Sequence, residues 1–153
     1  MDVFIMDVFG IPGTSHPASF IGKIELLSYS HGVASQANGF DVTSRRPIFQ
    51  DFAVTKRLDT TSPVLNLACV YGQNQGEVKI TWSRKEQEVV TPVMVYELSD
   101  VFISTISTSG GGDGAPMEAL ALEYSKIRWT FIPPKGAGEP ITRGWDLPNN
   151  TPL

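Results

Sequence analysis

Few side chains in this sequence have the types and spacing that catalysis or metal binding requires. The two histidines, His16 and His31, have no other metal ligand beside them in sequence, and neither a His-Glu-x-x-His nor a Cys-x-x-Cys motif occurs. His31 could in principle act as a base for a nearby serine, but the Gly-x-Ser-x-Gly motif that presents a nucleophilic serine is absent. We therefore predict a structural role for His31 and no metal site.

The acidic and glycine-rich segments offer no better candidates. Glu86 with Glu88, or Asp113 with Glu118, could serve glycoside chemistry only if the two carboxylates converged in a cleft, and turns and strand ends explain them more simply. The glycine cluster at residues 110–114 lacks the Lys and the Ser or Thr that follow in a phosphate-binding loop. We expect no catalytic residue and no cofactor, and we predict that the chain is not an enzyme.

The charge content restricts the partners that the chain can have. Charged residues make up 18% of the sequence, against roughly 25% in ordinary soluble domains. Either neutral polar residues occupy much of the surface or self-association covers it. The net charge is −4 and the longest basic run is the pair Arg45 and Arg46, so we expect no binding to nucleic acid. The single cysteine, Cys69, allows no internal disulfide and is expected to be a small buried hydrophobe.

Neither a secretory signal nor a membrane span is readable in the sequence. The chain begins without basic residues, and Asp7 interrupts the first apolar stretch before a signal-peptide core is complete. No apolar run approaches the roughly 20 residues that a membrane helix needs. We expect a protein that is made in the cytoplasm and does not insert into membranes.

Alternation of apolar and polar residues is the dominant pattern and predicts strands. Residues 77–83 place three apolar side chains on one face and four polar ones on the other. Similar stretches occur at residues 3–9, 21–30, 52–58, 89–98, 101–107, 118–131 and 141–147. The alternation slips near Ser125 and Lys126, as expected where a strand bends at a barrel corner or passes between packed sheets. We predict a single domain, residues 1–153, with a mainly β fold: a compact antiparallel β-barrel of two packed sheets with one short α-helix.

The helix is predicted at residues 62–72. Ser62 is a typical N-cap, Pro63 suits the first helical position, and Gly72 is a typical C-terminal stop. So short a helix must dock on a sheet through an apolar stripe. Two stripes are available: Leu65, Cys69 and Gly72, or Val64, Leu67, Ala68 and Tyr71.

Three segments are predicted to lie outside regular structure. Residues 36–48 form an extended loop without sustained periodicity, and the apolar side chains of Phe40, Val42 and Ile48 indicate that this loop makes contacts. The glycine-rich residues 107–116 are typical of a flexible hairpin tip. Residues 148–153 are expected to be a disordered tail.

Several segments, in the same order, resemble the haemolysin-coregulated protein (Hcp) family of type VI secretion systems. The first is Val-Phe-Ile-Met-Asp-Val-Phe-Gly-Ile-Pro-Gly at residues 3–13. The others are residues 24–33, 49–59, 61–63 with the helix that follows, 98–110, 122–127 and 144–147. The resemblance covers nearly the whole chain.

The resemblance implies a structural protein with a fold similar to that of phage tail-tube proteins. Members of the family assemble into hexameric rings that stack as a hollow tube, which a contractile sheath expels together with a spike protein of the VgrG kind. The tube can carry effector proteins in its lumen. The resemblance therefore implies assembly in the cytoplasm and export to the extracellular space or a target cell without a signal peptide.

The resemblance also suggests which residues make the functional contacts. Ser28, Ser30 and Gln36 are candidates for the surface that faces the lumen and the cargo. The candidates for ring or stacking contacts lie in the extended loop: Phe40, Val42, Arg45, Arg46 and Ile48.

Two other functions compete with the tube protein. A small-ligand-binding barrel would bind its ligand in an internal cavity, which Trp82, Trp129 and Trp145 could line. A hydrolase is the third hypothesis, and it lacks a recognisable nucleophile and base.

Overall fold

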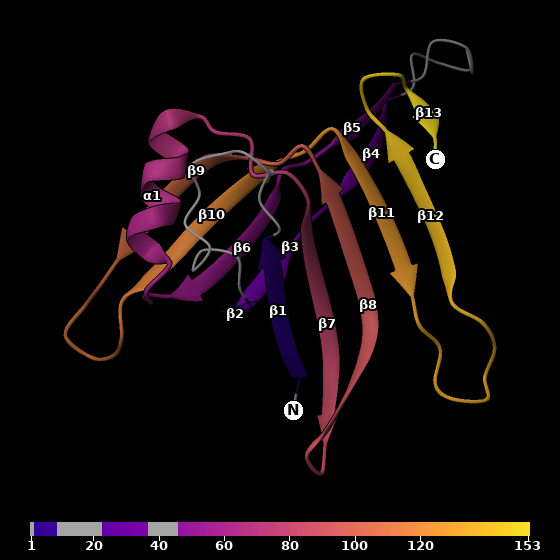
Figure 1. Ribbon diagram of the computed structural model, residues 1–153, viewed down its shortest axis with the longest axis horizontal. Coiled ribbons are helices and arrows are strands. Elements are labelled where there is room, and N and C mark those ends of the chain that lie inside the picture. Colours follow the sequence, from indigo (N-terminus) through magenta and orange to yellow (C-terminus); the bar gives the residue numbers. More distant parts are fainter. Residues whose placement is uncertain (1, 9–22, 37–45) are drawn as a thin grey trace.

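The computed structural model describes residues 2–8, 23–36 and 46–153, and it is built from antiparallel strands and one helix (Figure 1). A large sheet of seven strands has the order β13-β12-β11-β8-β7-β1-β2. A small sheet of four strands has the order β3-β6-β10-β9. Strands β4 and β5 form a two-stranded sheet, which we call the arm.

The element bounds follow the predicted pattern closely. The large sheet consists of β1 (Asp2–Val8), β2 (Lys23–Leu26), β7 (Val78–Glu86), β8 (Val89–Ser99), β11 (Lys126–Phe131), β12 (Ile141–Asp146) and β13 (Thr151–Pro152). The small sheet consists of β3 (Ser28–Ser30), β6 (Phe52–Arg57), β9 (Phe102–Ser109) and β10 (Met117–Glu123). The arm consists of β4 (Val33–Gln36) and β5 (Arg46–Phe49), and the helix is α1 (Ser62–Tyr71).

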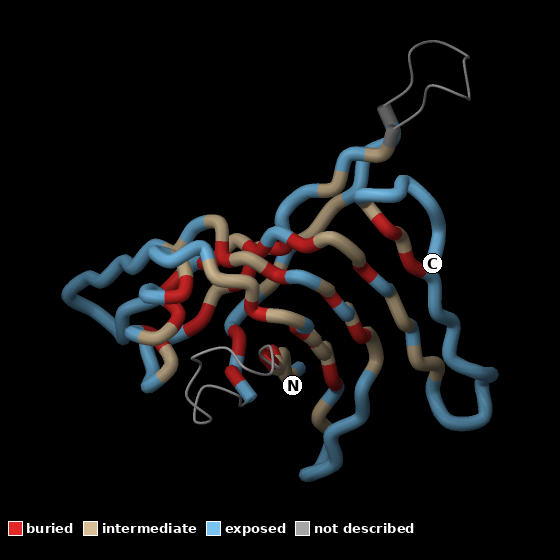
Figure 2. The backbone as a smooth tube through the Cα atoms, turned by 45° about the horizontal axis from the view of Figure 1, so that its top comes forward, coloured by how far each residue is buried: buried red, intermediate tan, exposed pale blue. Residues whose placement is uncertain are grey.

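The core lies between the inner faces of the two sheets, where alternate residues of the longer strands are buried (Figure 2). On β6, Phe52 and Val54 point inward, while their sequence neighbours are only partly buried. Met6 and Ile80, which are register partners on β1 and β7, are almost completely buried in the same core. This alternation is the period of two that predicted the strands.

Two bends join the sheets into a barrel. The chain passes from β10 in the small sheet to β11 in the large sheet. Beside it, the chain passes from β8, the partner of β11, to β9, the partner of β10. At the bend the backbone N–H of Ser125 donates to the carbonyl of Ser99, and the Ser125 hydroxyl hydrogen bonds with Asp100. The slip predicted near Ser125 and Lys126 is therefore a passage between packed sheets. Leu27 separates β2 from β3 at a second corner and donates its N–H to the carbonyl of Thr55.

The helix α1 confirms the predicted position and corrects its cap. Gly72 closes the helix in the left-handed conformation, as predicted. Ser62 is the first helical residue and not the N-cap, because the cap position belongs to Thr61. The hydroxyl of the buried Ser62 instead accepts hydrogen bonds from the N–H of Asp59 and from the Lys56 ammonium group. The buried helix residues are Ser62, Leu65 and Ala68, and Val64 and Cys69 pack partly buried against the core. The core-facing side therefore combines members of both predicted stripes and matches neither of them.

All three predicted irregular segments are partly strands, and residues 107–109 of the predicted hairpin tip belong to β9. The ends of the predicted loop at residues 36–48 belong to the arm, in which Gln36 pairs with Arg46 and Ala34 with Ile48. The expectation of a disordered tail at residues 148–153 is wrong, because β13 pairs with β12 there. The Asp146 carboxylate accepts hydrogen bonds from the side chain and the backbone of Asn149, and these bonds both shape the turn and lower the pKa of Asp146.

Candidate interaction surfaces

His31 lies in an aromatic cluster at the root of the arm. Its ring stacks on Phe52 at 5.4 Å between centroids and tilts against Trp129 at 6.3 Å. The indole N–H of Trp129 donates to Nε2 of His31 at 3.4 Å, and the Tyr124 hydroxyl lies 3.4 Å from Nδ1. Phe49, on β5 of the arm, stacks on the same Trp129 ring at 6.1 Å. Trp129 therefore contacts both β5 and His31, which lies two residues before β4.

This environment favours an uncharged His31. Burial lowers its pKa, and the opposing hydrogen bond to the Gln50 carbonyl is the smaller effect. Burial also raises the pKa of Tyr124, with a further contribution from the nearby Asp51 carboxylate. Protonated Nε2 would place its N–H against the N–H of Trp129, so the neutral ring is the one that satisfies the cluster. The prediction of a structural His31 fits these contacts.

The outer face of the small sheet carries only small, uncharged side chains across its centre. Two cross-strand rows run over β3, β6, β10 and β9, and we call them the small-residue face. One row is Ser30, Ala53, Ala121 and Thr105, and the other is Ser28, Thr55, Ala119 and Ser107. The hydroxyls of Ser28 and Thr55 lie 2.6 Å apart. Because these side chains are short, the face is flat and offers hydroxyl and methyl groups but no charge.

The structure places the predicted lumen residues in two different regions. Ser28 and Ser30 are exposed and lie side by side at the β3 end of the small-residue face. Gln36 belongs to β4 of the arm and not to the small sheet.

The predicted contact residues belong to the arm and to the segment beyond it. Ile48 is exposed on β5, next to Arg46 in the same short strand. Val33, on the facing strand, is also an exposed apolar residue. Phe40, Val42 and Arg45 lie outside the described residues. The arm therefore presents apolar side chains at a place where a second molecule can reach them.

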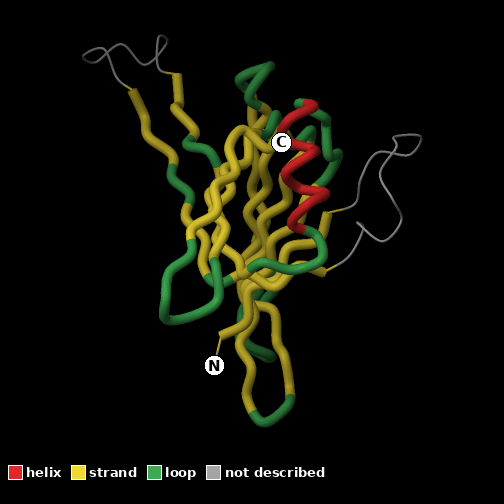
Figure 3. Tube along the Cα trace, turned by 90° about the vertical axis from the view of Figure 1, so that its left-hand side faces the viewer, coloured by secondary structure: helices red, strands yellow, loops and turns green. Residues whose placement is uncertain are grey.

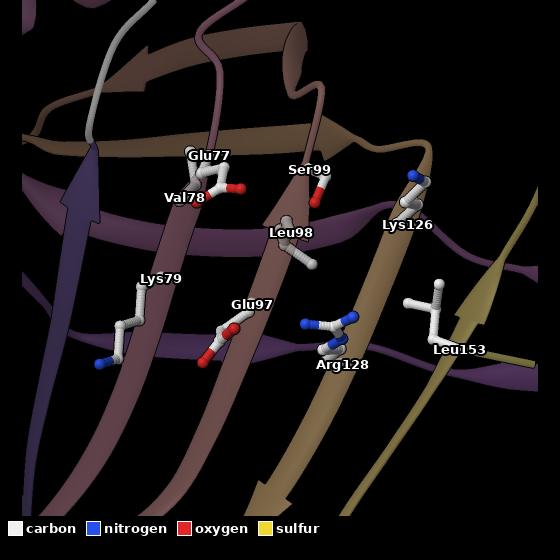
Figure 4. Close-up of a pocket in the computed structure, with 9 residues that line it drawn as sticks. All are labelled: Glu77, Val78, Lys79, Glu97, Leu98, Ser99, Lys126, Arg128 and Leu153. Atoms are coloured by element: carbon white, nitrogen blue, oxygen red, sulfur yellow. The ribbon is translucent and has the colours of Figure 1, made fainter.

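The outer face of the large sheet differs from the small-residue face because it is charged. Register partners on adjacent strands give the row Asp7, Lys79, Glu97 and Arg128. Figure 4 shows the last three members projecting from their strands into a shallow depression of about 400 Å³. Charges of both signs line this depression, which suits neither a bound phosphate nor a metal ion. Among the residues that the structure describes, no group of three His, Cys, Asp or Glu side chains could hold a metal.

The three tryptophans have separate surroundings. Trp82 lines an open groove of about 1010 Å³ beside the β7–β8 turn, together with Val89, Phe131 and Pro134. Trp145 lines a second depression of about 350 Å³, and Trp129 packs in the His31 cluster. The three tryptophan rings therefore do not line one common cavity, as the hypothesis of a ligand-binding barrel required.

One exposed apolar surface was not anticipated from the sequence. Leu67, Val70 and Tyr71 project outward from α1, with Val70 78% exposed. The second predicted helix stripe is therefore divided, because Leu67 and Tyr71 are exposed while its member Ala68 is buried. The available signal was the composition of residues 62–71, which contain no charged side chain. In the parts of the chain that the structure describes, no helix has both the length and the apolar character to cross a membrane.

Comparison with known proteins gives a consistent result. The family described as "Type VI secretion system effector, Hcp" matches residues 5–131. The protein hcp1 of Pseudomonas aeruginosa is 28% identical over 106 residues, which are 66% of this chain and 65% of that protein. The matched stretch thus spans slightly less than two thirds of the length of this curated relative.

Solved structures share the fold over almost the whole chain. The crystal structure of Hcp1 from Salmonella typhimurium has a TM-score of 0.79 at 21% identity, and the match covers 99% of each chain. A structure described as a type six secretion system protein has a TM-score of 0.84 at 21% identity, with 100% of each chain covered. The mainly β fold with two packed sheets and one helix is therefore the fold of these proteins.

Proposed function

The chain belongs to the Hcp family of type VI secretion tube proteins, and on this premise we propose that six copies close into a ring and that the rings stack into a hollow tube. A contractile sheath expels the tube with a spike protein at its tip, and effector proteins travel in the lumen. The protein is a structural component and not an enzyme. It assembles in the cytoplasm and is exported to the extracellular space or a target cell.

The observation that carries the proposal is the small-residue face. A channel wall that passes different folded proteins must stay hydrated and must not hold any one of them tightly. Charged or bulky side chains would create attractive patches or obstruct passage. Hydroxyl and methyl groups such as those of Ser28, Ala119 and Ser107 do neither. We therefore assign the small-residue face to the lumen.

The arrangement of the small sheet supports ring closure. Strands β3 and β9 are its two terminal strands, each paired within the sheet on one side. Open strand edges invite pairing with another chain unless they are covered. A ring places the β3 edge of one subunit toward the β9 side of the next, so that all the small-residue faces point to one central channel.

The arm supports contacts between subunits. It leaves the barrel at one end, and the β7–β8 turn lies at the opposite end (Figures 1 and 3). Exposed Val33 and Ile48 give it an apolar surface, while Phe49 and His31 anchor its root. We propose that this arm and residues 37–45 make contacts between subunits, either within a ring or between stacked rings.

The experiment that tests the proposal measures assembly directly. Sedimentation and native mass spectrometry of the purified chain are expected to give a mass near six subunits, and electron microscopy is expected to show rings with a central hole. A chain that stays monomeric at every concentration up to the millimolar range would contradict the proposal. A monomer that binds an apolar ligand would favour the small-ligand-binding barrel instead.

A further inference from the structure

The helix α1 has two apolar faces, and only one of them is used within the subunit. Leu65 and Ala68 are buried against the core. Leu67, Val70 and Tyr71 are 50%, 78% and 70% exposed, at the i, i+3 and i+4 spacing that places side chains on one stripe. Three exposed apolar residues at this spacing are typical of a helix that docks in a groove.

A matching apolar surface lies on the inner face of the large sheet. The large sheet has seven strands and the small sheet four, so part of that inner face has no opposing sheet. One cross-strand row runs from Leu26 through Trp82 to Phe131 and Ile141, and it is buried at its first end and exposed at its last. Leu26 is almost completely buried, whereas Phe131 is 44% and Ile141 56% exposed.

The exposed end of this row opens into the groove of about 1010 Å³ beside the β7–β8 turn. Its apolar lining includes Trp82, Val89, Phe131 and Pro134, and its charged residues are Arg84, Glu86 and Lys135. The indole N–H of Trp82 is buried and has no hydrogen-bond partner among the described residues. A buried donor without an acceptor is costly, and it indicates that a second molecule supplies the acceptor.

We propose that the outer stripe of α1 from one copy packs into this groove on the next copy, and that this contact closes the ring. The inference rests on the proposed function, because it states how neighbouring subunits meet. In the subunit, α1 lies on one side of the barrel and strands β11 and β12 lie on the other (Figure 1). A contact between two different, opposite surfaces is heterologous, and such a contact repeats around a closed ring.

The chemistry of the two surfaces is complementary. The α1 stripe carries no charge, so it can enter an apolar groove without an unpaired charge being buried. Tyr71 supplies the one side-chain oxygen of the stripe, and this hydroxyl can accept the hydrogen bond that Trp82 has to donate. A large aromatic anchor in a desolvated pocket is also the usual centre of a tight protein interface.

Paired cysteines test the contact. The variant Val70→Cys with Phe131→Cys, in a Cys69→Ala background, is oxidised or treated with a short bismaleimide and run on a denaturing gel. We expect a ladder of covalent oligomers that ends at six subunits. Either single-cysteine variant is expected to stop at a dimer. The matched control replaces Phe131→Cys with Ser107→Cys, which lies on the small-residue face and is expected to give no ladder.

Sedimentation of the same samples distinguishes a failure of the α1 contact from a failure of the proposed ring. Hexamers that give no ladder would overturn the α1 contact and leave the ring in place. A chain that is monomeric at every concentration would overturn the ring itself. Capture of another molecule in the groove of a hexamer, seen as density over Trp82 in a ring structure, would also overturn the α1 contact.

A charge pair gives an independent measurement if the cysteine variant folds poorly. Val70→Lys is expected to abolish the hexamer at a concentration where the parent chain is fully hexameric, while the circular dichroism spectrum stays that of the parent. Adding Phe131→Glu on the facing surface is expected to restore at least half of the hexamer. Restoration by Ala119→Glu, which adds the same negative charge on the distant small-residue face, would contradict the contact because it could not act through the groove.

Discussion

The outer faces of the two sheets differ, although both sheets are antiparallel and both bury apolar side chains on the inside. The large sheet carries a row of alternating charges across β1, β7, β8 and β11, including Lys79, Glu97 and Arg128. The small sheet has the uncharged small-residue face in the equivalent position. Charged side chains are therefore unevenly distributed: they are present on the outer face of the large sheet and absent from the small-residue face, which we assign to the lumen.

The small sheet reverses the usual arrangement of charge. The centre of its outer face is neutral, yet Lys56 and Glu118 are cross-strand neighbours that point inward and are completely buried. The Lys56 ammonium group lies 3.3 Å from the Glu118 carboxylate, 3.2 Å from Asp59 and 3.1 Å from the Ser62 hydroxyl. The network joins β6 and β10 to the start of α1. The charged groups of the small sheet that are buried, Lys56 and Glu118, thus hold the start of the helix against the sheet.

Removing one partner of the buried pair is expected to have the largest effect. Lys56→Met leaves the Glu118 carboxylate buried without its cation, which should cost about 3–5 kcal/mol of unfolding free energy. Urea denaturation followed by tryptophan fluorescence measures the loss.

The double variant Lys56→Met with Glu118→Leu is the matched control. It replaces the pair by apolar side chains of similar size and should recover most of the stability, to within about 1 kcal/mol of the parent. A double variant as unstable as Lys56→Met alone would show that the pair itself is strongly stabilising, contrary to our interpretation.

A charge on the small-residue face should act on cargo and not on folding. Ala119 is exposed near the centre of this face, and Ala119→Arg should leave the barrel folded and the rings intact. Six guanidinium groups around one channel would repel some effectors and retain others. We expect at least a tenfold change in the amount of effector that co-purifies with the rings, which corresponds to about 1.4 kcal/mol.

The matched change on the other sheet is Glu25→Arg, at an exposed position of the large sheet. It should leave effector binding unaltered. An equal effect of the two substitutions would mean that the small-residue face is not the lumen wall.

The two faces also show what the sequence could and could not reveal. Alternation predicted both sheets, because a period of two follows directly from the geometry of a strand with one buried face. It could not show that Ser28, Thr55, Ala119 and Ser107 form one row, since register depends on which strands pair across the chain.

Two other features were hidden for a similar reason. Both helix stripes of α1 are apolar, so composition could not decide between Leu65 and Leu67 as the docking residue. Glu118 lies at the start of β10, in keeping with the expected strand end. Its burial beside Lys56 could not be predicted, because it depends on the pairing of β6 with β10. The tail at residues 148–153 was mispredicted since its order depends on hydrogen bonds with Asp146 on β12.

The interface between the sheets should respond to acid through His31. Burial lowers its pKa in the folded protein below the unfolded value of about 6.5, so the unfolded chain binds more protons in this range. The contribution of neutral His31 is complete above about pH 6.5 and is lost as the pH falls below that value. The urea midpoint should therefore decrease between pH 7 and pH 5. His31→Phe keeps an aromatic ring that does not titrate, so the urea midpoint of this variant should change less between pH 7 and pH 5. If the midpoint of the variant decreased as much as that of the parent, groups other than His31 would cause the decrease.

A substitution on the charged outer face of the large sheet should have the smallest effect on the unfolding free energy. Glu97 is exposed, with Lys79 and Arg128 as its cross-strand neighbours, and exposed cross-strand charge pairs contribute only about 0.2–1 kcal/mol. Glu97→Gln should lower the unfolding free energy by about 0.5 kcal/mol, and less in 0.5 M salt because salt screens exposed charges. The hexamer should be unaffected. Dissociation of the ring by Glu97→Gln would instead make the charged row part of a subunit contact, and the contrast between an inward-facing neutral sheet and an outward-facing charged one would no longer hold.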